Sequence, residues 1–416
     1  HYVGFESNEP LGLHPIFPHV MPRSTTRYPN ADSLIDAARS FRRHHLGNER
    51  AAQWENERQV PLEVLRLAAG HGFTGIEVPV AHGGLDLGYR AKLRLVEELS
   101  RTCMAFAFSL VNTHNVAAKI ARHGSSTQAE KYLPELLTGE RIGATALTEV
   151  GAGSDLSAIA TSAQRVDDGW LLNGEKAWIT NATVADLFLV YAQTESNLGA
   201  RGIACFIVDA RRRGFDRLSA YSLLGGHAMG VSGFRLHDYH VDDSDLLYPP
   251  DSAFKSALNS INGARTYVAA MCCGMLYTGL ELALEYGSQR RTFGQLLSSR
   301  QGLNWLLADV ATDYEAARAL TERATVAIEV GKDAVLAAAH AKKFATRIAV
   351  TRLADCIQTM GANGLRDDIP LGRHLACAKI AHFVDGTTEI QNERIAAALH
   401  DTYPATLNSR SPDHCA

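Results

Sequence analysis

The apolar pattern of this chain changes its period twice, and this change constrains the fold more than any other feature of the sequence. Between residues 31 and 140 the apolar side chains recur about every 3.6 residues, as in amphipathic helices. From about Thr145 to Leu247 they alternate with a period of 2, as in half-buried strands. After Pro249-Pro250 the helical period returns and continues to about Leu399. The sequence therefore predicts a helical region, a β region and a second helical region, in that order.

Turn signals and composition refine this division. Asp168-Gly169 and Asn173-Gly174 are typical hairpin turns between short strands, which predicts a small antiparallel β domain. The helices after residue 250 are long and rich in alanine, and such helices usually pack as an antiparallel bundle. The predicted fold class is α+β. Its predicted parts are an extended arm or residual cloning sequence at 1–28, an N-terminal α-helical domain at 29–144, a middle antiparallel β domain at 145–249, a C-terminal helical bundle at 250–401 and a tail at 402–416.

The composition excludes several classes of function. With 416 residues, of which 46% are hydrophobic and 21% charged, the chain has ample material for globular cores. Its net charge of -4, with both signs interspersed, argues against a nucleic-acid or membrane partner. The sequence shows no apolar run long enough to span a bilayer and no signal peptide. We therefore expect a cytoplasmic protein whose main partner is a small molecule.

The cysteines and histidines give no indication of a metal site. The seven cysteines include no CxxC pair, and the 17 histidines form no HExxH motif. We expect the cysteines to be reduced core residues and the chemistry to need no metal.

The main catalytic candidate is Asp385, in the segment AHFVDGTTEIQ. Apolar or small side chains precede it and a helical run follows, so Asp385 is predicted to lie where a loop enters a helix. Partial burial at such a place raises the pKa of a carboxyl group toward the range that suits a general base. Asp and Thr are also typical helix N-caps, and these residues alone leave both interpretations open.

Four further segments carry groups that could contact a ligand, although each also has an ordinary structural explanation. ALTEVGAGSDL brings two glycines beside short hydroxyl side chains, which suits either a ligand or a simple turn. In NGEKAWITNA, alternation places Lys176, Trp178 and Thr180 on one face of a strand, where the indole flanks a flat ring or lies in the core. QRRTFG, followed by Gln301, offers a guanidinium, a hydroxyl and an amide for a pyrophosphate. QTMGANG ends a helix at a glycine-rich turn.

Taken together and in this order, these segments resemble the acyl-CoA dehydrogenase family. The resemblance runs from about Ala31 to Leu399, through GFTGIEVPVAHGG, TALTEVGAGSDL, GEKAWITNA, RRTFGQLLSSRQ, QTMGANG and DGTTEIQ. It implies a flavoprotein oxidoreductase in which FAD lies between the β domain and a C-terminal four-helix bundle. In this family a base removes the α-proton of an acyl thioester while the β-hydrogen leaves as hydride to the flavin N5. The thioester oxygen is stabilised by the backbone N–H of the base residue and by an FAD ribose hydroxyl.

The resemblance also implies roles for individual residues, with Asp385 as the base. The residues implied to hold FAD are Leu147, Thr148, Trp178, Thr180, Thr387 and Glu389. The residues implied to reach the FAD of a neighbouring subunit are Arg290, Thr292, Phe293, Gln301, Gln358 and Gly361. Such sharing implies a homotetramer, a dimer of dimers. The residues implied to contact substrate are Ser154 at the pantetheine arm, Arg265 at the wall that binds the thioester, and Val384 beside the base.

Two departures from the family pattern bear on the substrate. The family usually carries Glu where this chain has Asp385, and the alternative place for the base is Ala264 here, so Asp385 is the candidate that remains. Aspartate is shorter by one C–C bond, about 1.5 Å. Val384 replaces a larger aromatic residue and leaves more room near the α-carbon, which favours a branched, cyclic or carrier-protein-bound acyl group.

Three functions stay open on the sequence. The favoured one is dehydrogenation of an acyl-CoA or acyl-carrier-protein thioester, with an electron-transferring flavoprotein or O2 as the acceptor. The alternative is a flavin-dependent monooxygenase of the same fold acting on a small heteroatom substrate, although such relatives usually lack the carboxylate that Asp385 provides. The third is a non-catalytic, FAD-binding interaction protein. Anaerobic mixing with acyl thioesters separates the first from the others.

Overall fold

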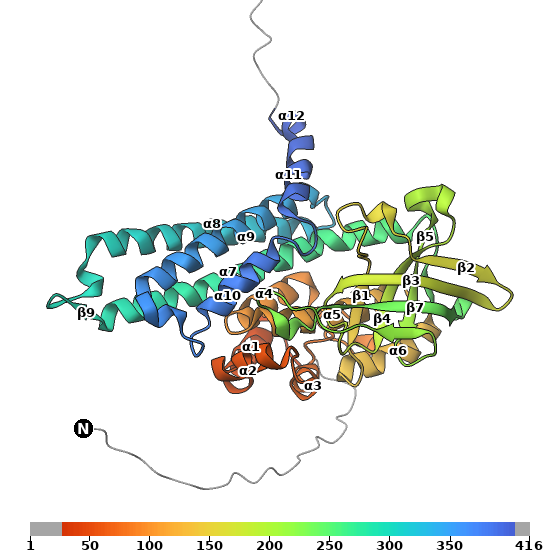
Figure 1. Cartoon of the computed structure of the whole chain (residues 1–416), viewed down its shortest axis with the longest axis horizontal. Helices are drawn as coiled ribbons and strands as arrows, with labels where there is room; N and C mark the ends of the chain where they lie inside the picture. The colour runs from red at the N-terminus through yellow and green to blue at the C-terminus, as the bar shows by residue number, and fades with distance from the viewer. Residues whose placement is uncertain (1–26, 404–416) are drawn as a thin grey trace, which may run out of the picture.

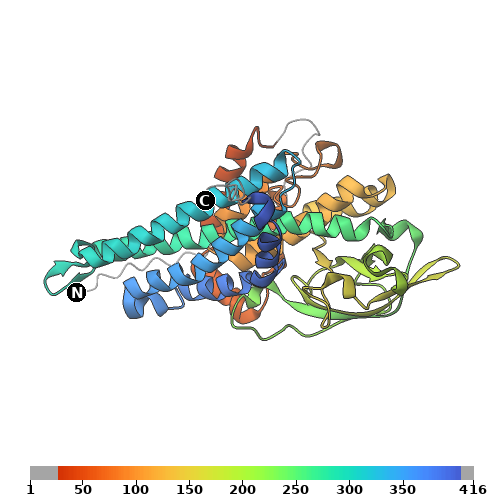
Figure 2. The same ribbon diagram turned by 90° about the horizontal axis from the view of Figure 1, so that it is seen from above.

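The computed structural model describes residues 27–403, which form a helical part, a sheet and a second helical part in that order (Figures 1 and 2). This order confirms the predicted fold class. The tail after residue 403 and most of the predicted arm at 1–28 lie outside the described residues.

The N-terminal part is helical. Its helices are α1 (Ala31–His45), α2 (Asn48–Glu57), α3 (Leu62–Gly70), α4 (Gly88–Ser100), α5 (Met104–His123) and α6 (Ser126–Thr138). Capping boxes begin two of them: Asn30 and Ser33 bond reciprocally at α1, and Ser125 and Gln128 do so at α6. Most of α5 is buried, because β1, α4, α6 and α7 pack against it. This helix therefore lies at the junction of the three parts.

The middle part is an eight-stranded sheet. Its strands are β1 (Gly143–Ala146), β2 (Ser162–Val166), β3 (Gly169–Ile179), β4 (Leu187–Gln193), β5 (Ile203–Asp209), β6 (Phe215–Arg217), β7 (Ser232–Val241) and β8 (Leu246–Tyr248). Their order is β6-β7-β3-β2-β4-β5-β8, with β1 paired to β4. The sheet is not purely antiparallel as predicted, since β1 runs parallel to β4 and β2 meets β4 in parallel at Ser162. The β2–β3 hairpin separates these strands in the chain, so no tight turn forces them to be antiparallel.

The predicted hairpin turn at Asn173-Gly174 is wrong. β3 continues through these two residues, which lie at a register shift against β7. Gly174 has a φ of +148°, and a Cβ at this position would come within 2.7 Å of Thr161. Glycine is therefore needed here for two reasons: it allows the bulge in β3, and it lets the segment around Thr161 come close to the strand. The turn predicted at Asp168-Gly169 lies one residue earlier: Asp167 and Asp168 join β2 to β3, and Gly169 begins β3.

The C-terminal part is a helix bundle. Its helices are α7 (Ala253–Gln289), α8 (Gln301–Glu329), α9 (Val335–Met360) and α10 (Leu371–Ala381), followed by α11 (Thr388–Ala397) and α12 (Leu399–Thr402). A short hairpin of β9 (Arg291–Thr292) and β10 (Gln295–Leu296) joins α7 to α8 at the end of the bundle far from the sheet (Figure 1). Small residues allow close packing inside the bundle: a Cβ on Gly279 of α7 would come within 2.9 Å of Leu353 of α9.

One helix, α7, is long and apolar enough by length and composition to cross a membrane, which the sequence analysis did not anticipate. In the fold, 67% of its most apolar 18-residue window is buried. The helix packs against α4, α8 and α9. A core helix that is covered on most sides has the same apolar composition, so this feature is weak support for a membrane span.

The described cysteines are buried and form no disulfide: they are Cys103, Cys205, Cys272, Cys273, Cys356 and Cys377. This agrees with the expected reduced core residues, while Cys415 lies outside the described residues. Among residues 27–403, no group of three or more His, Cys, Asp or Glu side chains is arranged to hold a metal ion.

Candidate active site

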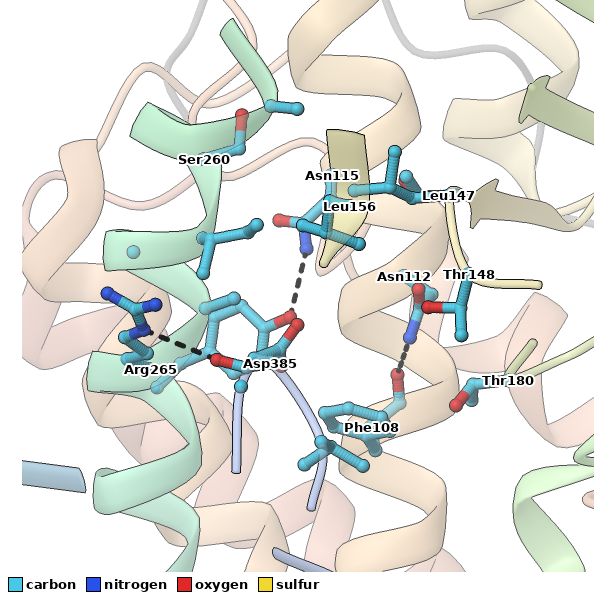
Figure 3. A pocket seen from close by; sticks show the side chains of 18 of the residues that line it. Phe108, Asn112, Asn115, Leu147, Thr148, Leu156, Thr180, Ser260, Arg265 and Asp385 are labelled. Carbon is cyan, nitrogen blue, oxygen red and sulfur yellow. Dashed lines mark hydrogen bonds between the residues drawn. The ribbon is translucent and has the colours of Figure 1, made fainter. Parts of the chain in front are cut away.

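A cavity of about 920 Å³ lies where the three parts of the chain meet (Figure 3). Its walls come from α5, the loop after β1, the end of β3, the first half of α7 and the turn before α11. Segments far apart in the sequence therefore form one site only in the folded chain. The predicted site residues that line it are Leu147, Thr148, Ser154, Trp178, Thr180, Arg265, Val384, Asp385 and Thr387.

The other predicted site residues do not line this cavity. Glu389 is exposed on the first turn of α11. The remaining six lie around the ends of α7, α8 and α9 and on the β9–β10 hairpin: Arg290, Thr292, Phe293, Gln301, Gln358 and Gly361. Five of these six are exposed, and the Phe293 side chain is 98% exposed. Figure 1 shows the hairpin at the end of the bundle opposite the sheet, so these residues do not contribute to the cavity of their own chain.

Asp385 lies in the turn between α10 and α11 and has a φ of 54°, followed by Gly386 at 97°. A left-handed backbone is strained for most residues with a side chain, and aspartate tolerates it better than most. The N-cap of α11 is Thr387, whose hydroxyl accepts the N–H of Ile390 at 3.4 Å. The cap interpretation that the sequence left open for Asp385 is therefore wrong.

Side chains from three helices hold this turn. Arg265 of α7 donates from Nε to the carbonyl of Asp385 at 3.3 Å (Figure 3). The carbonyl of Gly386 accepts from Gln391 of α11 at 2.9 Å and also from Lys342 of α9. The backbone N–H of Asp385 has no backbone acceptor among residues 27–403. Both carbonyls are thus held by helical side chains, and Asp385 itself lines the cavity.

The carboxyl group of Asp385 is poorly solvated. Its Oδ2 atom is buried and has no hydrogen-bond partner in the described part of the chain. Burial raises the pKa of Asp385 above its ordinary value, while the positive charges of Lys342, Arg265 and Lys119 act in the opposite direction. A carboxylate that has lost solvation and keeps a free oxygen is a better proton acceptor than an exposed one.

A buried ion pair fixes the loop after β1. Lys176 of β3 donates to Glu149 Oε1 at 2.7 Å and to the carbonyl of Leu147 at 3.2 Å. Glu149 also accepts the N–H of Thr161 at 3.0 Å. Buried charges need partners of this kind, because each is costly when left alone. The network holds Leu147 and the adjacent Thr148 at the cavity wall.

Trp178 does not follow the alternation that the sequence predicted. It has a φ of 60° and lies at a register shift of β3 against β7, between Lys176 and Ile179. Because of this shift, Lys176 is buried inside, whereas Trp178 and Thr180 line the cavity. The indole is 58% exposed, and its ring centroid lies 4.6 Å from that of Tyr221. The predicted common face of Lys176 with the other two residues is therefore wrong.

The groups on this side of the cavity fit a flavin. Trp178 offers a flat apolar surface, and Thr148 and Thr180, which carry hydroxyl groups, line the same cavity. Figure 3 shows both threonines on one side of the cavity, across from Arg265. A planar conjugated ring needs this combination of an apolar face and hydrogen-bonding groups at its edge.

A stripe on α5 with one aromatic and three polar residues was not predicted from the sequence. Phe108, Asn112, Asn115 and Lys119 follow one another at helical spacings of four, three and four residues, and all four line the cavity. The sequence signal for these residues is the helical spacing of polar side chains in an otherwise apolar helix.

The fold and the cavity suit a flavin-dependent oxidoreductase, and comparison with known proteins identifies the family. The N-terminal, middle and C-terminal domains of acyl-CoA dehydrogenases match residues 29–140, 144–239 and 252–400. The chain belongs to the acyl-CoA dehydrogenase family, and its cofactor is FAD. This confirms the predicted family, enzyme class and cofactor.

Three relatives illustrate the match. An acyl-CoA dehydrogenase of Bacillus subtilis (strain 168) is 33% identical over 346 residues, which cover 83% of this chain and 91% of the relative. The structure of butyryl-CoA dehydrogenase from Megasphaera elsdenii gives a TM-score of 0.85 at 30% identity and covers 91% of this chain and 100% of that one. The FAD complex of PigA gives a TM-score of 0.84 at 28% identity and covers 89% and 97%.

Proposed function

We propose that this protein removes hydrogen from the α,β-bond of an acyl thioester, with Asp385 as the base. The observation that carries the proposal is the state of the Asp385 carboxyl group, which borders the cavity, keeps a free Oδ2 and has a pKa raised by burial. Such a group is suited to taking a proton from carbon. Membership of the acyl-CoA dehydrogenase family supports the same class of reaction.

FAD, when bound, supplies the acceptor for the β-hydrogen, which leaves as hydride to the flavin N5. The backbone N–H of Asp385 donates to the thioester oxygen as negative charge develops there. Arg265 fixes the carbonyl of Asp385 and thereby sets the position of the carboxyl group. Ser154 contacts the pantetheine arm. The residues that hold FAD in this proposal are Leu147, Thr148, Trp178, Thr180, Thr387 and Glu389.

The acyl group is carried on coenzyme A or on an acyl carrier protein. Val384, half-buried at the cavity, leaves room for a branched or cyclic group next to the base. The reduced flavin passes its electrons to an electron-transferring flavoprotein or to O2.

Anaerobic mixing of the yellow holoprotein with saturated acyl thioesters tests this function. We expect the flavin absorbance to bleach without O2, because the thioester itself supplies the hydride. Flavin that stays oxidised with every CoA and carrier-protein thioester, together with O2-dependent oxidation of a heteroatom substrate, would establish the monooxygenase instead.

We also propose that the site is completed by a second copy of the chain in a homotetramer. Arg290 and Gln358 are exposed at the end of the bundle away from their own cavity, near the fully exposed ring of Phe293. Exposed guanidinium and amide groups beside an apolar ring suit a neighbour's pyrophosphate and protein surface.

Replacing Arg290 with Ala is expected to weaken FAD binding about 10- to 100-fold, the range for the loss of a hydrogen bond to a charged group, and to weaken the oligomer as well. The flavin-to-protein absorbance ratio and light scattering after gel filtration measure the two effects. Arg43→Ala is the matched control, because Arg43 is exposed on α1, far from the hairpin. A monomeric wild-type protein with full FAD would refute the sharing of the site.

A further inference from the structure

Lys119 faces the cavity without a counter-ion. This residue of α5 lines the wall, and its ammonium group has no hydrogen bond or ion pair with the residues between 27 and 403. Burial lowers the pKa of Lys119, and the nearby Cys205 and Asp385 oppose the shift. Lys119 is half-buried, so a ligand that covers its ammonium group removes the remaining water, and this loss is costly unless the ligand supplies a partner.

The charges around Lys119 leave the cavity wall positive. Glu77 is buried and pairs with both Lys92 and Arg122, the latter at 3.2 Å. Burial tends to raise the pKa of Glu77, but these partners outweigh it and hold the pKa at about 2, so the carboxylate is ionised. His114 Nε2 accepts the backbone N–H of Glu77 at 3.2 Å and lies 3.8 Å from the Glu77 carboxylate. The imidazole is neutral, because burial lowers the pKa of His114 to about 3. Two cations already share this carboxylate, and Lys119 adds a third positive charge.

A free hydroxyl donor lies on the same side of the cavity. Asn115, one turn before Lys119 on α5, donates to the Tyr267 hydroxyl of α7 at 3.5 Å (Figure 3). The carbonyl oxygen of Asn115 is engaged by Lys92 at 3.4 Å. The hydroxyl proton of Tyr267 has no acceptor in the described part of the chain. A phenol in this arrangement can donate to a ligand while it accepts from Asn115.

This wall does not suit a plain hydrocarbon chain. An alkyl group packed against Lys119 leaves the ammonium without solvent and without a partner. An anionic group restores both charge balance and hydrogen bonds. Lys119 and Asp385 form no ion pair, although the charge of each shifts the pKa of the other. Both side chains therefore stay available to one substrate.

We infer that the acyl group of the substrate carries a carboxylate at its far end, and that Lys119 pairs with it while Tyr267 donates a hydrogen bond, an assignment that rests on the proposed thioester dehydrogenation. Lys119 is then a specificity-determining residue. The base acts at the α-carbon, and the α5 wall holds the other end of the chain.

Matched pairs of CoA thioesters that differ only at the chain end test this assignment: butyryl with succinyl, pentanoyl with glutaryl, and hexanoyl with adipyl. We expect wild-type protein to prefer the carboxylate form in at least one pair, judged by kcat/KM. In that pair, Lys119→Met should lower the ratio of carboxylate to methyl substrate about 10- to 100-fold, as expected for a lost hydrogen bond to a charged group. Lys119→Arg should restore part of the ratio. Lys332→Met, at an exposed position between α8 and α9, should leave it unchanged.

Binding gives a second readout that does not depend on turnover. In Asp385→Asn protein the thioesters stay intact, and their effect on the flavin spectrum reports Kd. Adding Lys119→Met should weaken binding of the carboxylate thioester more than that of its methyl partner. A wild-type preference for methyl ends in every pair, or an equal loss on both ends in Lys119→Met, would overturn the assignment while leaving the dehydrogenation intact. Failure of all these thioesters and their carrier-protein forms to reduce the flavin would overturn the proposed function itself.

Discussion

Replacing Asp385 with Asn is expected to slow anaerobic flavin reduction by at least roughly 100-fold, the usual contribution of a positioned acid or base. Asn has the same shape but cannot accept the α-proton. The turn should keep its position, because Arg265, Lys342 and Gln391 bind backbone carbonyls rather than the side chain that is changed. Stopped-flow absorbance measures the rate, and the bound flavin and the circular dichroism spectrum check that FAD content and fold are retained.

Asp309→Asn is the matched control, because Asp309 is exposed on α8 away from the cavity.

The pH profile adds a second check. The ionised carboxyl is the base, so wild-type kcat/KM should fall as the pH drops through the raised pKa of Asp385, and the Asn variant should lack this limb. Reduction of the Asn variant at the wild-type rate would mean that Asp385 is not the base. Ala264 cannot replace it, so the monooxygenase would then be the better proposal.

The domain order could be predicted from the sequence because it depends on long elements whose periods are unambiguous. The pattern changes near Thr145 and Pro249, and the structure has β1 beginning at Gly143 and α7 at Ala253. The error at Asn173-Gly174 has a different origin. This dipeptide suits both a hairpin turn and a bulge, and the choice depends on the pairing of β3 with β7 and on the approach of Thr161.

The site was only partly predictable for a related reason. Short motifs identify the loop around Thr148 and the turn around Asp385, since glycines and short polar side chains are typical of loops and helix starts. The positive φ of Trp178 cannot be read from strand alternation, because a tertiary register shift produces it. The charge of the α5 wall depends on Lys92 and Glu77, which the fold brings to the same cavity as Lys119, with Lys92 bonded to Asn115. Helical spacing shows that Asn115 and Lys119 share one face of α5. It does not show which side chains of other elements pack against that face.

Replacing Asp385 with Glu tests how strictly this fold places its base. The extra C–C bond, about 1.5 Å, moves the carboxyl group toward the α-carbon. The turn cannot easily retract, because its carbonyls are held from α7, α9 and α11. An error near 1 Å can cost about 100-fold where the geometry is strict, so we expect roughly this loss in anaerobic flavin reduction with the best wild-type thioester.

The same variant is expected to gain activity on hexanoyl-CoA, since a straight chain leaves room beside Val384 for the substrate to shift away from the longer base. Stopped-flow reduction with both thioesters, at equal FAD content, measures the two effects. A Glu variant that matches or exceeds the wild type on the best thioester would show that the turn adapts, and that the short aspartate does not determine the substrate. A loss on one thioester with a gain on the other instead links the length of the base to the shape of the acyl group, because FAD content and fold are common to both measurements.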